Sequence, residues 1–194
     1  GQGGMAAEGY YDMFWKSGCS AGNCIADKIK AGDYVIIQFG INDRNKSTNE
    51  KYNSSMTAMF NETRAKGAYP IIMSPIRRCY FFNNDSIYES YHEYPWLARE
   101  LSESLDVPMI DMDTLARNYM LSLGYTYTSQ FVFNHATKAE YSNLGSDQAD
   151  DVHLQMNGAN AYGRIITEQM RVHKDPIVKK LGDYMAPMYQ VSVK

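Results

Sequence analysis

The sequence predicts an α/β fold built on a parallel sheet. Three short apolar segments, residues 33–39, 69–75 and 107–111, alternate with segments in which apolar residues recur at helical spacing. The first, Asp33-Tyr-Val-Ile-Ile-Gln-Phe39, has almost no polar alternation, which is typical of a strand covered by helices on both faces. Strands that alternate with helices pair in parallel through right-handed crossovers. These observations place the chain in the α/β class.

The predicted helices have recognisable start and stop signals. The first covers residues 48–66 and is followed by Gly67, in the position that a left-handed cap prefers. Pro75 then stops the strand at 69–75. The second helix covers residues 93–105 and can start at Pro95, a favoured first-turn residue. Its inward-facing side chains are expected to be Trp96, Leu97, Leu101 and Leu105.

A third helix follows the strand at 107–111. Asp113 is its predicted cap, and Gly124 ends it. Residues 125–149 show no periodicity and are long for a connection in a compact domain, which favours a functional loop. A last helix opens at Asn157 or Gly158 and runs to about Val172. We therefore expect a domain over residues 1–172 and a C-terminal tail over residues 173–194.

Three strands are few for this architecture. The strand at 33–39 is apolar enough to be a central strand, which needs a neighbour on each side. We expect a polypeptide segment that precedes Gly1 to complete the sheet. Without it, the open edge of Val35–Phe39 should make the 194-residue chain associate or become poorly soluble.

Composition and charge exclude several classes of protein. The chain is 44% hydrophobic and 21% charged, with a net charge of −3, as in a single globular domain. This balance supplies no basic field for phosphate backbones, so no nucleic acid partner is expected. No stretch reaches the roughly 18 apolar residues of a membrane span, and no leader opens the chain, so no membrane association is expected.

The chain has three cysteines. Cys19 and Cys24 flank a turn containing Gly22 and Asn23, so a small-loop disulfide is plausible, with two free thiols as the alternative. The disulfide would indicate an oxidising compartment and leave Cys79 as a buried thiol. No second Cys or His pair stands at zinc-ligand spacing, so no metal is expected.

Polar residues follow each predicted strand, at the edge where open parallel sheets bind ligands. Asp150-Asp-Val-His153 is expected at the same edge because it closes the long loop. There the Asp150 carboxylate could take the Nδ1 proton of His153 and leave Nε2 as a general base. The alternatives are a surface helix cap and, less so, a metal site that includes His92 or His135.

Gly40-Ile-Asn-Asp43 follows the first strand and suggests a second function. Gly40 allows a tight turn, and the Asn42 amide could stabilise an oxyanion. The alternative is an Asx turn that only ends the strand. Past the second strand, Arg77 and Arg78 could bind substrate carboxylates, or they could simply be solvated. Residues 80–94 and the long loop are rich in tyrosine and could form walls for a sugar chain.

Together, the segments 33–43 and 150–159 resemble two sequence blocks of the GDSL or SGNH hydrolases, and more narrowly those of the rhamnogalacturonan acetylesterase-like carbohydrate esterases. The resemblance covers roughly residues 1–172. It implies a three-layer α/β/α sandwich with a parallel, flavodoxin-like sheet. It also implies that His153 is the catalytic base and Asp150 its orienting acid. The implied oxyanion site contains Asn42 and the backbone N–H of a glycine. Gly4 is the best match for this glycine, and its neighbour Gly3 is close to the same position. Gly40 is a further candidate for the oxyanion site.

One departure from the family is large. The family's nucleophilic serine lies in a Gly-Asp-Ser block on its first strand, and this sequence contains no such block. Gly18-Cys-Ser20-Ala-Gly22 formally fits a nucleophile elbow, but an elbow needs a preceding strand. We therefore expect the serine to lie on a segment upstream of this sequence.

The resemblance implies a secreted microbial esterase that removes acetyl groups from pectic polysaccharide (rhamnogalacturonan). The expected mechanism is Ser-His-Asp acyl transfer with no cofactor, and Arg77 and Asp43 are the candidate substrate contacts. Two alternatives remain open. One is a lipolytic esterase or thioesterase of the same fold, and the other is a non-catalytic sugar-binding remnant.

Overall fold

The computed structural model describes residues 3–185. Their contacts divide the chain into two compact units. Unit 1 contains the residues up to Arg77 together with Glu89–Thr114, and unit 2 contains Arg78–Tyr88 and the residues from Leu115 onward. Within the described residues, no helix is both long and apolar enough to cross a membrane.

Unit 1 is built on a parallel sheet. Its strands are β1 (Tyr34–Gln38), β2 (Tyr69–Met73) and β5 (Met109–Ile110), in the order β1-β2-β5. Tyr34 is opposite Tyr69, and Met73 is opposite Ile110. The prediction of an α/β chain with a parallel sheet is confirmed. The three-layer arrangement and the flavodoxin-like strand order stay predictions.

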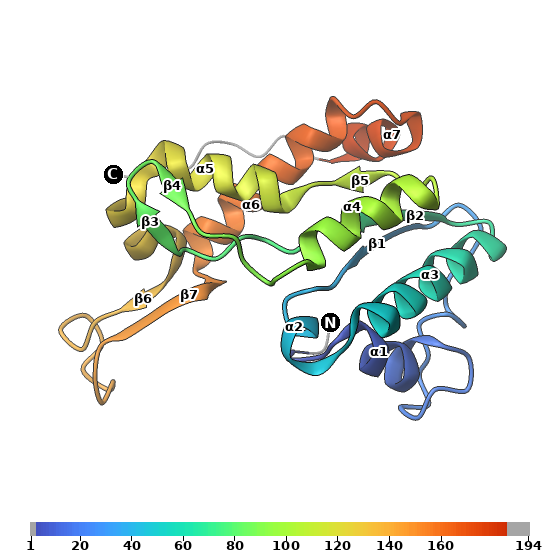
Figure 1. Cartoon of the computed structure of the whole chain (residues 1–194), viewed down its shortest axis with the longest axis horizontal. Coiled ribbons are helices and arrows are strands. Elements are labelled where there is room, and N and C mark those ends of the chain that lie inside the picture. Colours follow the sequence, from blue (N-terminus) through green and yellow to red (C-terminus); the bar gives the residue numbers. More distant parts are fainter. Residues whose placement is uncertain (1–2, 186–194) are drawn as a thin grey trace. The chain divides into compact units, whose positions relative to one another are not determined.

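Helices pack against one face of this sheet (Figure 1). They are α1 (Ala7–Tyr10), the π-helical turn η1 (Tyr11–Trp15), α3 (Asn49–Ala65) and α4 (Tyr94–Ser104). The predicted helix at 48–66 is confirmed as α3. Thr48 accepts a hydrogen bond from the Lys51 N–H, and Gly67 follows with φ +73°. The core includes Trp15, Ile37, Tyr52, Met56, Phe60, Ile72 and Leu97.

Two predictions about burial in unit 1 are wrong. Trp96 on α4 is 54% exposed instead of facing inward. β1 is not covered on both faces: Ile37 is buried, but Ile36 is 43% exposed. Within the described residues, β1 lies at the edge of the sheet and pairs only with β2. The apolar sequence of β1 is typical of a central strand, yet β1 has an open edge.

The described part of unit 2 combines antiparallel hairpins with helices (Figure 1). One hairpin joins β3 (Phe81–Asn83) to β4 (Ser86–Ile87), and the other joins β6 (Phe133–Ala136) to β7 (Gln148–Leu154). The helices are α5 (Met112–Tyr127), which starts in unit 1, α6 (Met156–Arg171) and α7 (Pro176–Tyr184). The π-helical turn η2 (Thr128–Val132) connects α5 to β6.

Two expectations for this part of the chain need correction. Residues 125–149 are not an aperiodic loop, because they contain η2, β6 and the start of β7. Asp113 does not cap α5; instead, the Asp111 carboxylate accepts from the Thr114 N–H at 3.4 Å. The predicted helix end at Gly124 is confirmed, because its φ of +75° and ψ of 168° are non-helical and separate the predicted helix from a further helical segment that continues to Tyr127.

The region predicted as a tail contains a helix. The Asp175 carboxylate caps α7 by accepting from the N–H groups of Ile177 and Val178, and Pro176 occupies the first turn. Gly182 lets α7 approach α6, since a Cβ at this position would lie 2.6 Å from the Arg171 nitrogen. Residues 186–194 of the predicted tail lie outside the described part of the chain.

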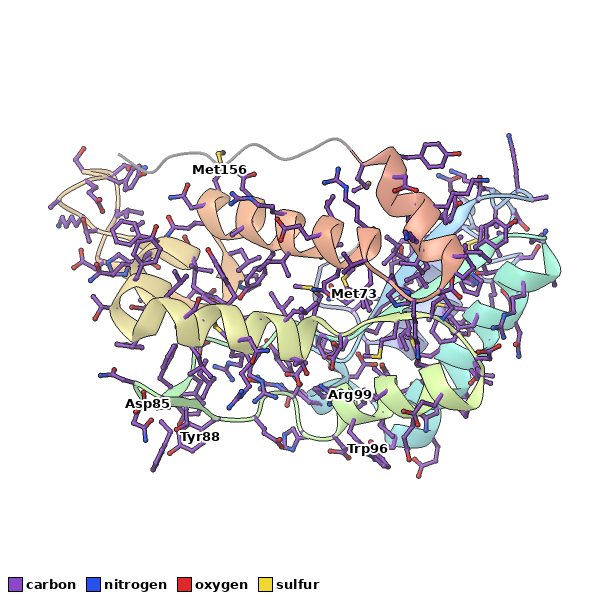
Figure 2. The ribbon with its side chains drawn as sticks, turned by 90° about the horizontal axis from the view of Figure 1, so that it is seen from above. Met73, Asp85, Tyr88, Trp96, Arg99 and Met156 are labelled. Atoms are coloured by element: carbon purple, nitrogen blue, oxygen red, sulfur yellow. A yellow bond between two sulfur atoms is a disulfide. The ribbon has the colours of Figure 1, made fainter. Side chains whose placement is uncertain are left out.

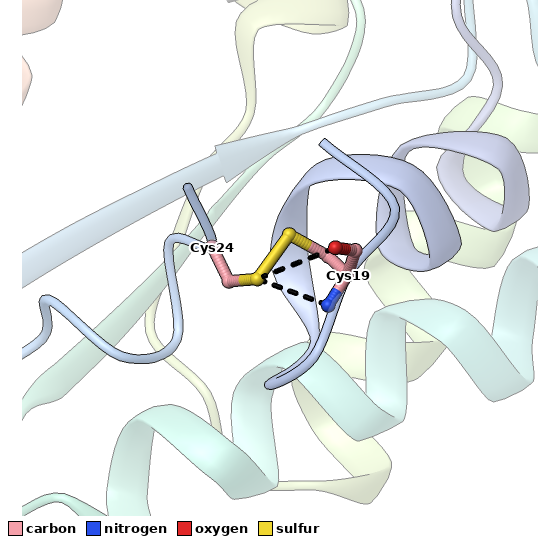
Figure 3. The surroundings of a disulfide bond; sticks show 2 residues. All are labelled: Cys19 and Cys24. Carbon is pink, nitrogen blue, oxygen red and sulfur yellow. Dashed lines mark hydrogen bonds between the residues drawn. A yellow bond between two sulfur atoms is a disulfide. The ribbon is translucent and has the colours of Figure 1, made fainter. Parts of the chain in front are cut away.

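A disulfide closes the turn after η1. Cys19 and Cys24 are joined, and the Cys19 N–H donates to the Cys24 Sγ at 3.0 Å (Figure 3). Of the two alternatives that the sequence left open, the structure shows the disulfide, and Cys79 is a free, buried thiol.

We expect the double variant Cys19→Ser/Cys24→Ser to lower the free energy of unfolding by about 2 kcal/mol, because the cross-link closes a short loop in the unfolded chain. Urea denaturation of variant and parent measures the loss. Reduction of the parent protein is the control and should produce the same shift. Equal midpoints for reduced and oxidised parent protein would contradict a stabilising role.

Candidate functional site

Asp150 and His153 form a hydrogen-bonded pair on β7. The His153 Nδ1 lies 2.6 Å from the Asp150 Oδ2. The other carboxylate oxygen, Oδ1, accepts from the backbone N–H groups of Val152 and His153 at 2.6 and 2.9 Å. The His153 side chain is 79% exposed. The predicted pairing is confirmed in geometry, and it leaves Nε2 directed away from Asp150 as an acceptor for a proton.

The charge of Asp150 follows from its partners. Partial burial opposes ionisation, but hydrogen bonds from the His153 ring and from the two backbone N–H groups outweigh it, so the pKa of Asp150 is lowered. The carboxylate is therefore ionised at neutral pH. An ionised Asp150 fixes the tautomer of His153 and stabilises the imidazolium that forms when the ring takes a proton.

An irregularity in the strand pairing creates this geometry. Phe133 pairs with Leu154 and His135 pairs with Ala149, so residues 150–153 face a single residue of β6. A bulge frees backbone N–H groups from the ladder and redirects side chains. Here the freed N–H groups of Val152 and His153 turn back to Asp150. The sequence predicted a turn before a helix, and the structure places the pair in a bulged strand that ends just before α6.

A neighbouring segment of unit 2 holds the bulge in place. Arg78 binds the Asp151 carboxylate through Nε and a terminal nitrogen, with a shortest distance of 2.6 Å. The Cys79 N–H donates to the Asp151 carbonyl oxygen at 2.9 Å. Arg78 is therefore neither a solvated side chain nor available for a substrate carboxylate. Sequence reasoning missed this contact because 73 residues separate the partners.

Cys79 has a suppressed thiol acidity. Burial raises its pKa to about 12, and the Asp151 carboxylate adds to the effect. We expect iodoacetamide at about pH 8 to leave Cys79 unmodified in the folded protein, because only a thiolate is nucleophilic. Mass spectrometry of native and urea-unfolded samples tests this, with complete labelling expected only after unfolding. Rapid labelling of the native protein would show that the thiol is accessible and ionised.

A pocket of about 610 Å³ lies beside Asp150 in unit 2. Its walls combine an aromatic ring, hydroxyl and amide groups, and the two aspartates of β7. This mixture of apolar area with a few hydrogen-bonding groups is typical of small-molecule sites. The lining residues include Tyr125, Ser129, Gln130, His135, Asp150 and Asp151.

The candidate oxyanion residues meet in unit 1. Gly4, its neighbour Gly3, Gly40 and Asn42 all line one groove of about 500 Å³ that runs along β1. Asn42 precedes the short helix α2 (Asp43–Lys46), and its side chain does not cap this helix. No hydrogen bond of the Asn42 amide to another residue within 3–185 is present. The amide is thus available as a donor, and Gly4 adopts φ +72°.

Gly40 and Asp43 contact other residues of the protein, whereas the sequence predicts Gly40 in the oxyanion site and Asp43 in contact with substrate. The fully buried Asp43 carboxylate accepts from the Gly40 N–H at 2.9 Å and from the Ala7 N–H at 2.8 Å. Gly40 has φ +118°, and a Cβ there would lie 3.1 Å from side-chain atoms of Pro75 and Tyr94. The Gly40 N–H is occupied, so it is not a free oxyanion donor. The Asp43 carboxylate is enclosed, so a role in substrate contact is not supported.

Arg77 also has a buried partner. Its Nε and one terminal nitrogen each donate to the Asp113 carboxylate at 2.8 Å, and both side chains are buried. Arg99 bridges Asp111 and Asp113 at 3.0 and 2.8 Å. The predicted substrate role of Arg77 is not supported, because the donors that would bind a carboxylate already do so within the protein. Opposite charges hold together the ends of β2 and β5.

Two alternative sites are not supported. Ser20 is exposed between the disulfide cysteines, and the π-helical turn η1 lies before it instead of the strand that an elbow needs. Within residues 3–185, no three His, Cys, Asp or Glu side chains lie close enough together to hold a metal ion.

The sequence is similar to known esterases. It is 31% identical over 148 residues to the rhamnogalacturonan acetylesterase RhgT of Bacillus subtilis, covering 74% of this chain and 63% of the relative. The chain is therefore similar to the rhamnogalacturonan acetylesterase-like SGNH hydrolases. A second B. subtilis relative is the uncharacterized esterase YxiM, 27% identical over 147 residues, or 74% of this chain and 35% of the relative. The chain thus spans only part of both relatives. No family model matches the sequence.

Two solved structures are similar to this chain. The crystal structure of B. subtilis YxiM has a TM-score of 0.64 at 25% identity and covers 87% of this chain and 43% of that protein. A mutant of Axe2, an acetyl-xylooligosaccharide esterase from Geobacillus, has a TM-score of 0.56 at 16% identity. The match covers 85% of this chain and 67% of the Axe2 chain. The second likeness is one of fold alone.

Proposed function

We propose that this chain is part of a secreted carbohydrate acetylesterase that acts on acetylated pectic polysaccharide. The observation that carries the proposal is the His153 ring, bound through Nδ1 to an ionised Asp150 and exposed at Nε2. A relative named as a rhamnogalacturonan acetylesterase supports the substrate class. The Cys19–Cys24 disulfide supports an oxidising, extracellular location.

The proposed reaction is acyl transfer through a serine. The serine hydroxyl attacks the acetyl carbonyl carbon while Nε2 of His153 takes its proton. The amide of Asn42 and a backbone N–H of Gly4 or Gly3 stabilise the negative oxygen of the tetrahedral intermediate. His153 then returns the proton to the departing sugar oxygen. Water, activated by the same ring, releases acetate from the acetyl-serine and regenerates the hydroxyl.

The serine is proposed to come from a segment outside this sequence, paired as an additional strand with the open edge of β1. Within residues 3–185 no strand pairs with that edge, and beside it lie an exposed Ile36 and an apolar groove lined by Tyr10, Trp15 and Ile25. The same groove contains Gly4 and Asn42. A strand added there would cover the edge and bring its residues beside the candidate oxyanion donors.

The experiment compares the 194-residue chain with a version extended upstream through its natural reading frame. We expect only the extended protein to release acetate from acetylated rhamnogalacturonan and to react with a fluorophosphonate probe. Peptide mapping should place the label on a serine of the added segment. Labelling of Ser20, or hydrolysis of long-chain esters in preference to acetylated polysaccharide, would contradict the proposal.

A further inference from the structure

The outer face of the β3–β4 hairpin in unit 2 has three exposed aromatic rings. Tyr80, Phe82 and Tyr88 are 54%, 66% and 42% exposed. The ring centroids of Tyr80 and Tyr88 are 4.7 Å apart, and those of Phe82 and Tyr88 are 5.2 Å apart. A cluster of apolar side chains that is exposed to solvent indicates a binding surface. We call these three residues the aromatic platform.

The hairpin holds the rings in fixed positions. Phe81 and Ile87 pair across the strands and face the other way, and Ile87 is buried. In the turn, the Asn83 side-chain oxygen accepts from the Asp85 N–H at 2.9 Å and from the Ser86 hydroxyl at 3.0 Å. Figure 2 labels Asp85 and Tyr88 close together at this end of the hairpin. A surface ordered before binding loses little conformational entropy when a ligand arrives.

We propose that the aromatic platform binds a polysaccharide chain by stacking sugar rings on Tyr80, Phe82 and Tyr88. The proposal rests on the function proposed above, because it takes the ligand class from that function. The C–H faces of pyranose rings pack against aromatic faces, and the tyrosine hydroxyls can bond to sugar hydroxyls at the edges. The opposite face of the same hairpin packs near the pocket beside Asp150, because the ring centroids of Phe81 and Tyr125 are 5.7 Å apart and Tyr125 lines that pocket.

Charge and area favour a sugar chain over other occupants. Asp85 is the only charged residue between positions 79 and 88, and the preceding cation, Arg78, binds Asp151. The platform is therefore not built to recognise uronate carboxylates, and binding should survive high salt. The exposed ring area is roughly 300 Å² for three half-exposed aromatic side chains. A stable dimer needs about 800 Å² from each partner.

The test is binding of the 194-residue chain to acetylated rhamnogalacturonan in native affinity electrophoresis, which needs no nucleophile. We expect Phe82→Ala and Tyr88→Ala each to weaken binding roughly three- to tenfold. Phe82→Leu should behave like Phe82→Ala, whereas Phe82→Tyr should retain binding because it keeps the ring. Trp96→Ala removes a comparably exposed ring from α4 and is the matched control, with no loss expected. Thermal melts check that each variant is folded.

Each outcome separates the platform from the esterase proposal. Binding that depends on Phe82, together with an upstream-extended protein that releases no acetate, supports the platform and overturns the enzyme. Acetate release by the extended protein without Phe82-dependent binding overturns the platform alone. Binding abolished by salt, or a dimer that Phe82→Ala dissociates in sedimentation analysis, also overturns it.

Discussion

His153→Ala is expected to lower kcat/KM for acetyl release by about 10⁴- to 10⁶-fold in the upstream-extended protein, because the serine would lose its general base. Asp150→Asn should cost about 10⁴-fold, since an amide can hold the ring in the wrong tautomer and cannot stabilise an imidazolium. The measurement is acetate release under matched conditions.

The controls for this prediction separate chemistry from folding. His153 is exposed and its side chain has one hydrogen bond in the structure, to Asp150, so the melting temperature of His153→Ala should stay near that of the parent. His92→Ala removes another exposed imidazole, in unit 1, and should leave activity unchanged. Comparable activity losses in the His153 and His92 variants would argue against a catalytic base at position 153.

The second large effect is expected at the charge cluster of unit 1. Asp113→Ala should lower the free energy of unfolding by about 3–5 kcal/mol, because it leaves the buried Arg77 guanidinium without its carboxylate. Asp12→Ala is the matched control: it removes a 2.6 Å ion pair, to Lys16, in which both side chains are solvent-exposed. That loss should be at most about 1 kcal/mol.

Urea denaturation monitored by circular dichroism gives the free energy of unfolding of both variants and of the parent protein. The difference between the two losses measures what burial adds to an ion pair. If Asp113→Ala were no less stable than Asp12→Ala, the Arg77 guanidinium would have to be hydrogen-bonded to water or to another acceptor. The conclusion that Arg77 is buried and depends on Asp113 would then be wrong.

Local patterns in the sequence were enough for part of the fold. Helix α3 has a capping threonine, one apolar face and Gly67 after its end, and each of these signals is contained within the segment. β1 was recognised from its apolar run, but its burial was not, because exposure depends on whether another strand lies beside it. The Asp150–His153 pair was also predictable, since the partners are three residues apart.

Two elements that were not predicted also have local signals in the sequence. Asn84-Asp85 between Phe82 and Ile87 is a turn signal for the β3–β4 hairpin. Asp175-Pro176 is a helix start signal for α7. The partners of Arg77 and Arg78 had no such signal. Asp113 and Asp151 lie 36 and 73 residues away, so only the fold brings these charges together.

The most direct test of the proposed site is a crystal structure of the upstream-extended protein after reaction with a fluorophosphonate. The phosphonyl oxygen then stands in for the oxyanion. The proposal predicts that this oxygen accepts a hydrogen bond from the Asn42 amide, that the modified serine lies on a strand beside β1, and that Nε2 of His153 faces the serine oxygen. A structure in which Asn42 and His153 point to opposite sides of the molecule would contradict it.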